Sequence, residues 1–267
     1  MPSIGWTTKD GQNFSFEEAL AIARKEGAFE KFPAPALIAM RNERDDYQHL
    51  SPSGATRCNR QKVLQAENDY WQDLEGAWPA FTGNAYHREL AHATVEHFGV
   101  NNHHVREERW MQMDLDVLLP DGTIYPFKMS GTPDLYDIDE GTLYDWKSVG
   151  DFVYYDSELK QKVTRVFPYP EHELQINLYA LFMGSTIKRA FIWYVKSEGK
   201  KGVTRRLVPV ELWDREDAYH TACELAVPLA WYAKTGELPQ EVYDPSLWMC
   251  RACPVKAICQ QLRTEGK

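Results

Sequence analysis

The hydrophobic and polar positions of the first fifty residues follow a helical pattern. From about Ser15 to Phe32 the apolar residues recur at helical spacing, with Phe16, Ala19 and Ile22 among them. A stretch that contains two prolines follows. The pattern therefore predicts one helix over residues 15–32, followed by this proline-containing stretch.

Residues 51–98 resume the helical pattern. Ser51-Pro52-Ser53 is typical of a capped helix start and places Cys58 in the first turns. Residues 66–82 are rich in Trp and acidic side chains and predict an irregular segment. A second helix is expected from about Thr82 to Phe98.

The middle of the chain changes to the pattern of β-strands. Short apolar runs bounded by turn residues occupy positions 105–119, 123–127, 131–138 and 142–146. A helix is predicted over 171–184, then strands over 190–195 and 203–210, and a long helix capped by Asp214 that reaches about Thr235. This order favours an α/β sandwich, in which a mixed sheet is flanked by helices, over a doubly wound parallel fold.

Composition limits the class of protein. The chain has 267 residues, 43% of them hydrophobic, which suffices for one large domain or one domain with appendages. No stretch approaches the roughly eighteen apolar residues of a membrane span, and the first residues lack the features of a signal peptide. We therefore expect a cytoplasmic setting, where the five cysteines are free, metal-bound or catalytic rather than disulfide-bonded.

The net charge of −9 weighs mildly against a nucleic-acid partner, because phosphate contacts need Lys and Arg. Net charge does not say where the charges lie, however. Basic residues gather locally at Lys160, Lys162 and Arg165, and again at Lys196, Lys200, Lys201, Arg205 and Arg206. Each group fits a DNA-binding rim and fits a solvated surface equally well.

The segment Gly131-Thr132-Pro133-Asp134 and the strand that carries Asp145 and Lys147 are the most informative part of the sequence. Residues two apart on a strand share a face, so Asp145 and Lys147 project together and Trp146 points to the other face, into the core. If Asp134 ends the neighbouring strand, its carboxylate can meet that of Asp145. Two adjacent carboxylates favour Mg²⁺ or Mn²⁺, and a lysine beside the metal can act on a water molecule. An exposed hairpin with ordinary charges is the alternative.

Three more residues are placed to join this group. His87 lies on the helix before the sheet and could supply a nitrogen ligand, although a lone helical His more often packs or faces solvent. Gln175 and Tyr179 are four apart on the next helix and share one face. They could contact substrate near the metal.

In order along the chain, these residues resemble the RecB-like branch of the PD-(D/E)xK nucleases. That family shows a helical His, then GxxD, then DxK on the next strand, then QxxxY on the following helix. The resemblance covers residues 51–260 and implies a restriction-endonuclease-like mixed central sheet. It implies that a metal ion is held by His87, Asp134, Asp145 and the backbone carbonyl of Trp146. It also implies that Lys147 acts on the water, while Gln175 and Tyr179 organise the site and the DNA.

Cys250, Cys253 and Cys259 form a C-x2-C-x5-C group, for which Cys58 is the candidate fourth ligand. Zinc usually takes two local pairs of cysteines, so this arrangement is unusual for zinc, which stays open as the alternative. One remote and three clustered cysteines resemble RecB-like nucleases with a 4Fe-4S cluster, such as the AddB nuclease domain and the small exonucleases of CRISPR adaptation. In that reading the cluster joins the N- and C-terminal segments of the nuclease. Cys223 is left over and is interpreted as a buried small hydrophobe.

We interpret the chain as an N-terminal extension, residues 1–50, and a nuclease domain, residues 51–267. The resemblance implies a DNA exonuclease that acts on single strands from the 5′ end, in recombination, CRISPR adaptation or phage DNA processing. A partner such as a helicase would supply unwinding. Base stacking could use Trp71, Trp78, Tyr86 and Tyr179. A catalytically silent DNA-binding or structural subunit that retains the cluster is the alternative.

Overall fold

A computed structural model describes most of the chain. The described residues are 3–40, 47–99, 104–107, 110–149, 153–156, 161–164, 167–197, 203–240, 250 and 253–265. No helix within these ranges combines the length and the apolar character needed to cross a membrane.

The N-terminal residues form a small α/β unit. Strand β1 (Ser3–Thr7) pairs antiparallel with β2 (Asn13–Ser15) and parallel with β4 (Tyr70–Asp73). Helix α1 (Phe16–Glu26) begins at a capping box formed by Ser15 and Glu18, and α2 (Ala34–Met40) follows it. The first turns of helix α4 (Leu74–Phe98) complete a separate core. Its buried members are Trp6, Phe16, Ala19, Ala23, Phe29, Phe32, Leu37, Met40, Leu74 and Ala77.

The larger part of the chain is built on two sheets. A five-stranded sheet has the order β13-β12-β9-β8-β5, and a three-stranded sheet has the order β3-β7-β6. In the first sheet β9 and β12 are parallel, whereas the other neighbours are antiparallel. The strands are β3 (His49–Leu50), β5 (Val105–Glu107), β6 (Met111–Leu118), β7 (Ile124–Gly131), β8 (Leu135–Asp137), β9 (Thr142–Ser148), β12 (Arg189–Ser197) and β13 (Val203–Val210). A separate hairpin, β10 (Val153–Asp156) with β11 (Gln161–Thr164), connects β9 to the next helix.

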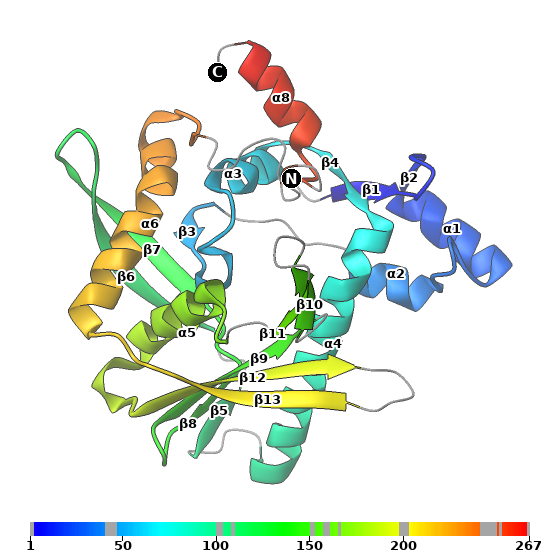
Figure 1. Ribbon diagram of the computed structural model, residues 1–267. Coiled ribbons are helices and arrows are strands. Elements are labelled where there is room, and N and C mark those ends of the chain that lie inside the picture. Colours follow the sequence, from blue (N-terminus) through cyan, green and yellow to red (C-terminus); the bar gives the residue numbers. More distant parts are fainter. Residues whose placement is uncertain are drawn as a thin grey trace.

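Helices cover both faces of the five-stranded sheet (Figure 1). Helix α5 (Pro170–Met183) packs on the face that carries Leu143 and Ile192, and α4 (Leu74–Phe98) reaches the opposite face, where Tyr86 contacts Trp193. Helix α6 (Arg215–Thr235) lies along β6 and β7 and beside α5 (Figure 1). The fold is therefore mixed α/β, with mixed sheets flanked by helices.

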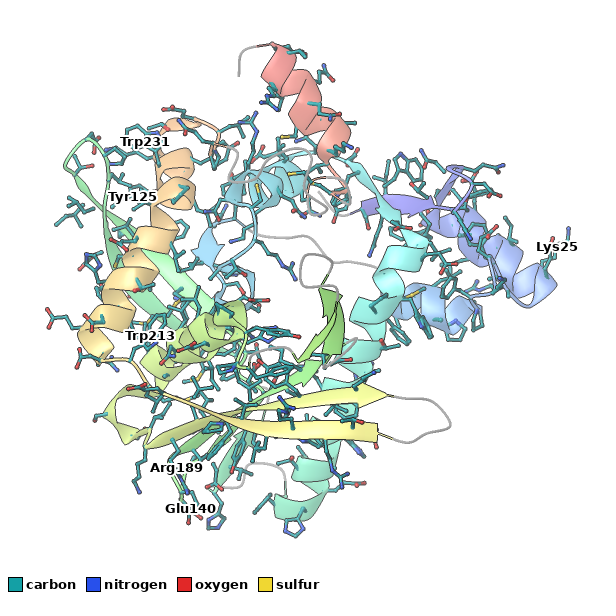
Figure 2. The ribbon with its side chains drawn as sticks, in the orientation of Figure 1. Lys25, Tyr125, Glu140, Arg189, Trp213 and Trp231 are labelled. Carbon is teal, nitrogen blue, oxygen red and sulfur yellow. The ribbon has the colours of Figure 1, made fainter. Side chains whose placement is uncertain are left out.

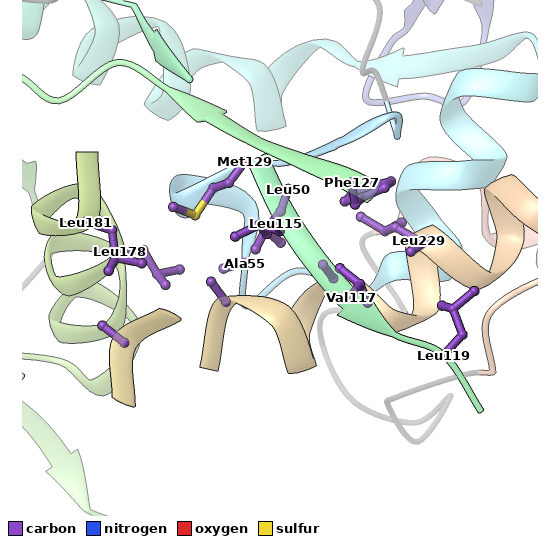
Figure 3. Close-up of a cluster of buried hydrophobic side chains, with 14 of the residues drawn as sticks. Leu50, Ala55, Leu115, Val117, Leu119, Phe127, Met129, Leu178, Leu181 and Leu229 are labelled. Atoms are coloured by element: carbon purple, nitrogen blue, oxygen red, sulfur yellow. The ribbon is translucent and has the colours of Figure 1, made fainter. Parts of the chain in front are cut away.

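The main core lies where α5 and α6 meet the three-stranded sheet. Figure 3 shows Leu115, Val117 and Met129 of the strands facing Leu178 and Leu229 of the helices. All five are fully buried. Each such side chain contributes about 1.5–3 kcal/mol relative to exposure, so this core fixes β7 and α5, the two elements that adjoin the candidate site.

A last cluster joins distant segments. Helix α3 (Asn59–Glu67) and the C-terminal helix α8 (Lys256–Thr264) lie side by side (Figure 1). Buried Leu64, Tyr70 and Val255 form its centre, with Ile258 and Leu262 packed against them.

The strands over 190–195 and 203–210, the helix over 171–184 and the cap at Asp214 are confirmed. Other predictions were wrong. The helix expected to start at Ser51 is a short 3-10 turn, Pro52–Gly54, and Cys58 is the N-cap of α3 rather than a residue of its first turns. The single strands expected over 105–119 and over 131–138 are each divided between the two sheets. Helix α1 ends at Gly27, whose φ of 90° suits only glycine, rather than continuing to Phe32. Residues 70–81 are not irregular but form β4 and the first turns of α4, which accommodates Pro79 in its second turn.

Candidate active site

The two predicted acidic residues meet at a break between the two sheets. Strand β7 ends at Gly131, and β8 begins at Leu135 in the other sheet, so Asp134 lies in the connection. Because β8 pairs antiparallel with β9, with Leu135 opposite Tyr144, Asp134 lies beside Asp145. The Trp146 backbone N–H donates to Asp134 Oδ2 at 2.6 Å and holds this carboxylate against β9.

His87 reaches the same point from α4. Its Nδ1 lies 2.8 Å from Asp134 Oδ1. Burial lowers the pKa of His87, but the hydrogen bond and the charge of Asp134 outweigh burial, and the pKa is raised overall. The structure therefore brings together a histidine and a carboxylate that are 47 residues apart.

Asp145 and Lys147 form a buried ion pair. Lys147 Nζ lies 2.6 Å from Asp145 Oδ2, and Asp145 is 1% exposed. Burial raises the pKa of the Asp145 carboxyl, while the charge of Lys147 and its hydrogen bond oppose the rise. This carboxylate is thus paired directly with a cation inside the protein.

Helix α5 supplies the remaining predicted residues. Gln175 Nε2 donates to Asp145 Oδ1 at 3.3 Å. The side chains of Gln175 and Ser53 lie within hydrogen-bonding range of the Tyr179 hydroxyl, and burial raises the pKa of Tyr179. The predicted shared face of the helix is thus present. Tyr179 is only 4% exposed, however, so its ring is not open for base stacking as we expected.

Gly131 has a steric role that explains the glycine in the GxxD segment. A Cβ atom at this position would lie 2.9 Å from Tyr179 Cε1 and 3.0 Å from Pro52 Cδ. Real Cβ atoms are not found that close to a packed ring. Glycine therefore lets the end of β7 approach α5 and the turn at Pro52.

These six residues, His87, Asp134, Asp145, Lys147, Gln175 and Tyr179, form what we call the carboxylate–lysine centre. It lies toward the ends of β9 and β12, away from their starts, which are marked by the Glu140–Arg189 ion pair (Figure 2). His172, on the same helix as Gln175, also lies near Lys147. Burial lowers the pKa of His172, and the charge of Lys147 lowers it further. Sequence reasoning missed His172, although its spacing of three from Gln175 was a usable signal.

The prediction that Trp146 points into the core was wrong, because its side chain is not fully buried. Its side chain is half-buried on the back of the sheet, 5.8 Å between ring centroids from Tyr144 and 5.6 Å from Trp193. Phe191 stacks on the other side of Tyr144, also at 5.8 Å. The alternation of β9 was predicted correctly, but the back of the sheet carries a partly open row of aromatic rings.

The other residues proposed for base stacking belong to the N-terminal unit or to α4. Trp78 is 41% exposed and contacts Phe32 and Phe81. Trp71 is half-buried against the backbone of Gly5, where a Cβ would lie 2.4 Å from its ring. Within the described part of the chain, the ring contacts of Trp71 and Trp78 stay inside the N-terminal unit and the start of α4.

The four predicted cysteine ligands, Cys58, Cys250, Cys253 and Cys259, are half-buried and not disulfide-bonded, and we call them the cysteine cluster. Cys58 is the N-cap residue of α3, and the Cys253 backbone N–H donates to the Cys250 carbonyl at 3.3 Å. Burial raises the pKa of the Cys253 thiol to about 11, and the charges of the other three cysteines add to the rise. Cys223 is half-buried on α6, near Tyr219, apart from this group.

The predicted basic rim is described only in part. Lys160, Arg165, Lys200 and Lys201 lie outside the described residues, and only the backbone of Lys162 is described. Lys196 is half-buried on β12, and Arg205 and Arg206 are exposed on β13. Arg206 pairs with Tyr194, which in turn pairs with Lys147, so these three side chains share one face and Arg205 faces the other.

Within the described ranges, no three His, Cys, Asp or Glu side chains stand at the mutual spacing of bound metal ligands. The chemistry of the carboxylate–lysine centre still fits a divalent cation. Neighbouring ligands of an octahedral ion with bonds of about 2.1 Å lie about 3 Å apart, close to the 2.8 Å between His87 and Asp134. The carboxylate of Asp145 adds hard oxygen donors to this group, and it lies beside Asp134 on the neighbouring strand.

Comparison with known proteins places the chain in a family. The model of the PD-(D/E)XK nuclease superfamily matches residues 43–260. The solved structure of SSO0001 is 13% identical, with 91% of this chain and 95% of that chain covered and a TM-score of 0.49. A chain from Eubacterium rectale, provisionally named an exonuclease, is 15% identical, with 77% and 88% covered and a TM-score of 0.44. The curated proteins include no match. Because the family model spans most of its length, the chain belongs to the PD-(D/E)XK nuclease superfamily.

Proposed function

We propose that the chain is a metal-dependent exonuclease that hydrolyses single-stranded DNA from the 5′ end and belongs to the RecB-like branch of its superfamily. The observation that carries this proposal is the meeting of Asp134, Asp145 and Lys147 in one buried place beside His87. A purely structural hairpin has no reason to bury two carboxylates and a lysine together, because buried charges are costly unless they are paired.

In this proposal, His87, Asp134, Asp145 and the Trp146 carbonyl would hold Mg²⁺ or Mn²⁺. The ion would lower the pKa of a bound water and neutralise charge on the phosphate. Lys147 is held in place by Asp145 at 2.6 Å and can donate a proton to, or stabilise, an oxygen in front of it. Gln175 fixes the orientation of the Asp145 carboxylate through its hydrogen bond, and Tyr179 and Gly131 close the packing behind Gln175.

We further propose that the cysteine cluster binds a 4Fe-4S cluster that fastens the C-terminal segment to α3. The other three cysteines raise the pKa of the Cys253 thiol, so a positively charged metal group would favour the thiolate that acts as the ligand. The packing of α8 against α3 around Leu64 and Val255 supports a structural role, because both helices adjoin the cysteines. Iron content against zinc content in anaerobically purified protein tests this proposal: about four irons per chain are expected. One zinc without iron would overturn it.

The division into an extension of residues 1–50 and a nuclease domain of residues 51–267 also stays a proposal. The separate core of the N-terminal unit supports it, although β1 pairs with β4 of the following part. We propose that a partner, such as a helicase or a protein of recombination or CRISPR adaptation, supplies unwound DNA.

Single- and double-stranded oligonucleotides, each with free or blocked ends, test the activity in the presence of Mn²⁺, Mg²⁺ or a chelator. We expect cleavage of the unblocked single strand, progressive shortening from the 5′ end, and loss of activity with the chelator. Cleavage of circular or end-blocked DNA at the same rate would refute the exonuclease proposal but not nuclease activity. Absence of metal-dependent cleavage of every substrate would favour a silent subunit.

A further inference from the structure

Three half-buried rings lie between Lys147 and the exposed Arg206. The rings are Phe167, Tyr169 and His172, and with Arg206 they form what we call the ring track. The centroids of His172 and Tyr169 are 5.2 Å apart, and those of Tyr169 and Phe167 are 4.9 Å apart, nearly parallel at 21°. The Arg206 guanidinium lies 5.0 Å from the centroid of Phe167. The three rings thus lie between two positively charged side chains, Lys147 and Arg206.

Tyr194 anchors the ring track to the sheet. This buried residue accepts the Tyr169 backbone N–H at 3.1 Å, and its hydroxyl lies 3.0 Å from His172 Nδ1. The Phe167 ring meets its edge at 4.5 Å. The start of α5 and the residues before it are therefore held across the sheet, on the face of the carboxylate–lysine centre, rather than lying loosely in solvent.

The strand register places the two ends of the ring track. Lys147, Tyr194 and Arg206 stand side by side on β9, β12 and β13. Strands lie about 4.8 Å apart, so the backbones at Lys147 and Arg206 are separated by about 10 Å. The duplex spacing of about 3.4 Å per nucleotide is a lower limit for an extended single strand, so at most about three nucleotides cover this distance. A strand bound at Lys147 can therefore reach Arg206 within a few nucleotides.

We propose that the ring track binds the single-stranded DNA that adjoins the scissile phosphate, with bases on the rings and a phosphate on Arg206. The inference rests on the proposed nuclease function and gives its substrate preference a structural basis. Unpaired bases can stack on aromatic side chains whatever their sequence, whereas bases in a duplex are already stacked and paired. Burial and the Lys147 charge lower the pKa of His172 to about 4, so its ring is neutral at neutral pH. Because His172 is neutral, Arg206 is the residue of the ring track that can bind a phosphate through its charge.

Arg205 provides a matched control, because it is exposed on the same strand but faces the other side of the sheet. Binding of a fluorescent single-stranded oligonucleotide is measured in chelator over a range of salt concentrations. We expect Arg206→Gln to weaken binding and to reduce the log–log salt slope by about 0.7, the value for one contact to a single strand. Arg205→Gln should leave the slope unchanged, and Arg206→Lys should restore it. Equal slopes for the two Gln variants would overturn the phosphate contact.

The rings are tested with Tyr169→Leu, which keeps the backbone N–H that binds Tyr194. We expect about tenfold weaker binding of the single strand and little change for a blunt duplex. Unchanged single-strand affinity in a variant with a normal melting temperature would mean that the rings only pack, and would overturn the inference. If Tyr169→Leu melts early, the single replacements Phe167→Leu and His172→Gln decide in its place.

A small phosphodiester separates this inference from the proposed function. Methyl p-nitrophenyl phosphate has a single short aryl arm and no second nucleotide-like arm, so its Mn²⁺-dependent hydrolysis reports mainly on the carboxylate–lysine centre. We expect Arg206→Gln and Tyr169→Leu to keep this hydrolysis while losing oligonucleotide binding. Failure of the wild-type protein to hydrolyse any diester would count against the proposed function, whereas the binding comparison would still judge the ring track.

Discussion

In the carboxylate–lysine centre each acid has a partner from another element, whereas the cysteine cluster brings together four groups of one kind. Asp134 is matched with His87 and a backbone N–H, and Asp145 with Lys147 and Gln175. The four cysteines have no such complement among themselves, since each nearby thiolate raises the pKa of Cys253. The first group can keep its arrangement through its own contacts, while the second needs a cation or a metal group to favour its charged form.

This difference predicts what removal of metal does to each region. The carboxylate–lysine centre should retain its geometry in a chelator, because its hydrogen bonds and ion pairs do not depend on an ion. The cysteine cluster should lose much of its stability, because ligand binding by thiolates is also folding free energy. The comparison therefore separates the region proposed to carry out the chemistry from the region proposed to hold the fold together, and the following variants test that separation.

The largest expected effect is loss of cleavage in Asp145→Asn. This change keeps the shape and the contact with Gln175 but removes the charge that pairs with Lys147. We expect single-turnover cleavage in Mn²⁺ to fall about a thousandfold or more, with little change in melting temperature. Asp114→Asn, at an exposed position of β6, is the control and should cleave normally. A variant that keeps a tenth of wild-type activity would show that the buried pair is structural.

The next effect concerns stability in Cys58→Ser. Loss of the single ligand from α3 should release the C-terminal segment and lower the melting temperature by about 10 °C, as expected for a few kcal/mol in a chain of this size. Cys223→Ser, outside the cysteine cluster, should shift the melting temperature by only a few degrees. Cleavage rates measured per folded molecule should change much less than stability. Equal melting temperatures for the two variants would contradict the assembly role.

The sequence predicted the carboxylate–lysine centre better than its surroundings, for a physical reason. Alternation along β9 and helical spacing on α5 are local rules, so Asp145 with Lys147, and Gln175 with Tyr179, could be placed on shared faces. The break at Gly131, which moves the chain from one sheet to the other, depends on packing against Tyr179 and is not visible locally.

The fold shows the same limit. Strand β1 forms a local hairpin with β2, for which Asp10-Gly11 was a usable turn signal that sequence reasoning missed. Its second partner, β4, lies more than sixty residues later in the chain, and no short-range pattern could reveal that pairing. The Trp and acidic side chains of residues 66–82 favoured an irregular segment, but burial of Leu74 and Ala77 in the N-terminal core holds the first turns of α4, even with Pro79 inside the helix. Long-range packing decided this case.

A smaller effect is expected for Gly131→Ala. The added Cβ would press on Tyr179 and Pro52, neither of which can move like the end of a flexible side chain. We expect a loss of about 1–3 kcal/mol in the free energy of unfolding, together with slower cleavage as Gln175 shifts. Gly83→Ala, in α4, meets no atom within 4 Å and should instead gain up to about 1 kcal/mol. Two variants with the same sign of change would show that packing behind Gln175 is loose.

The last prediction concerns how the free energy of unfolding depends on pH through His172, which lies half-buried near Lys147. Burial, and then Lys147, lower the pKa of His172 to about 4 in the folded protein, against about 6.5 when unfolded. The folded state therefore binds fewer protons between these values, and stability rises with pH across this window and falls as acid is added. His172→Gln should remove this dependence, which after solvent screening amounts to about 2 kcal/mol between pH 7 and 4. Denaturant unfolding at several pH values measures the slope, and His220→Gln, an exposed histidine on α6, should leave the slope almost unchanged. A wild-type slope in His172→Gln would mean that neither burial nor Lys147 lowers the pKa of His172 in the folded protein, and His172 would then be charged in the ring track below about pH 6.5.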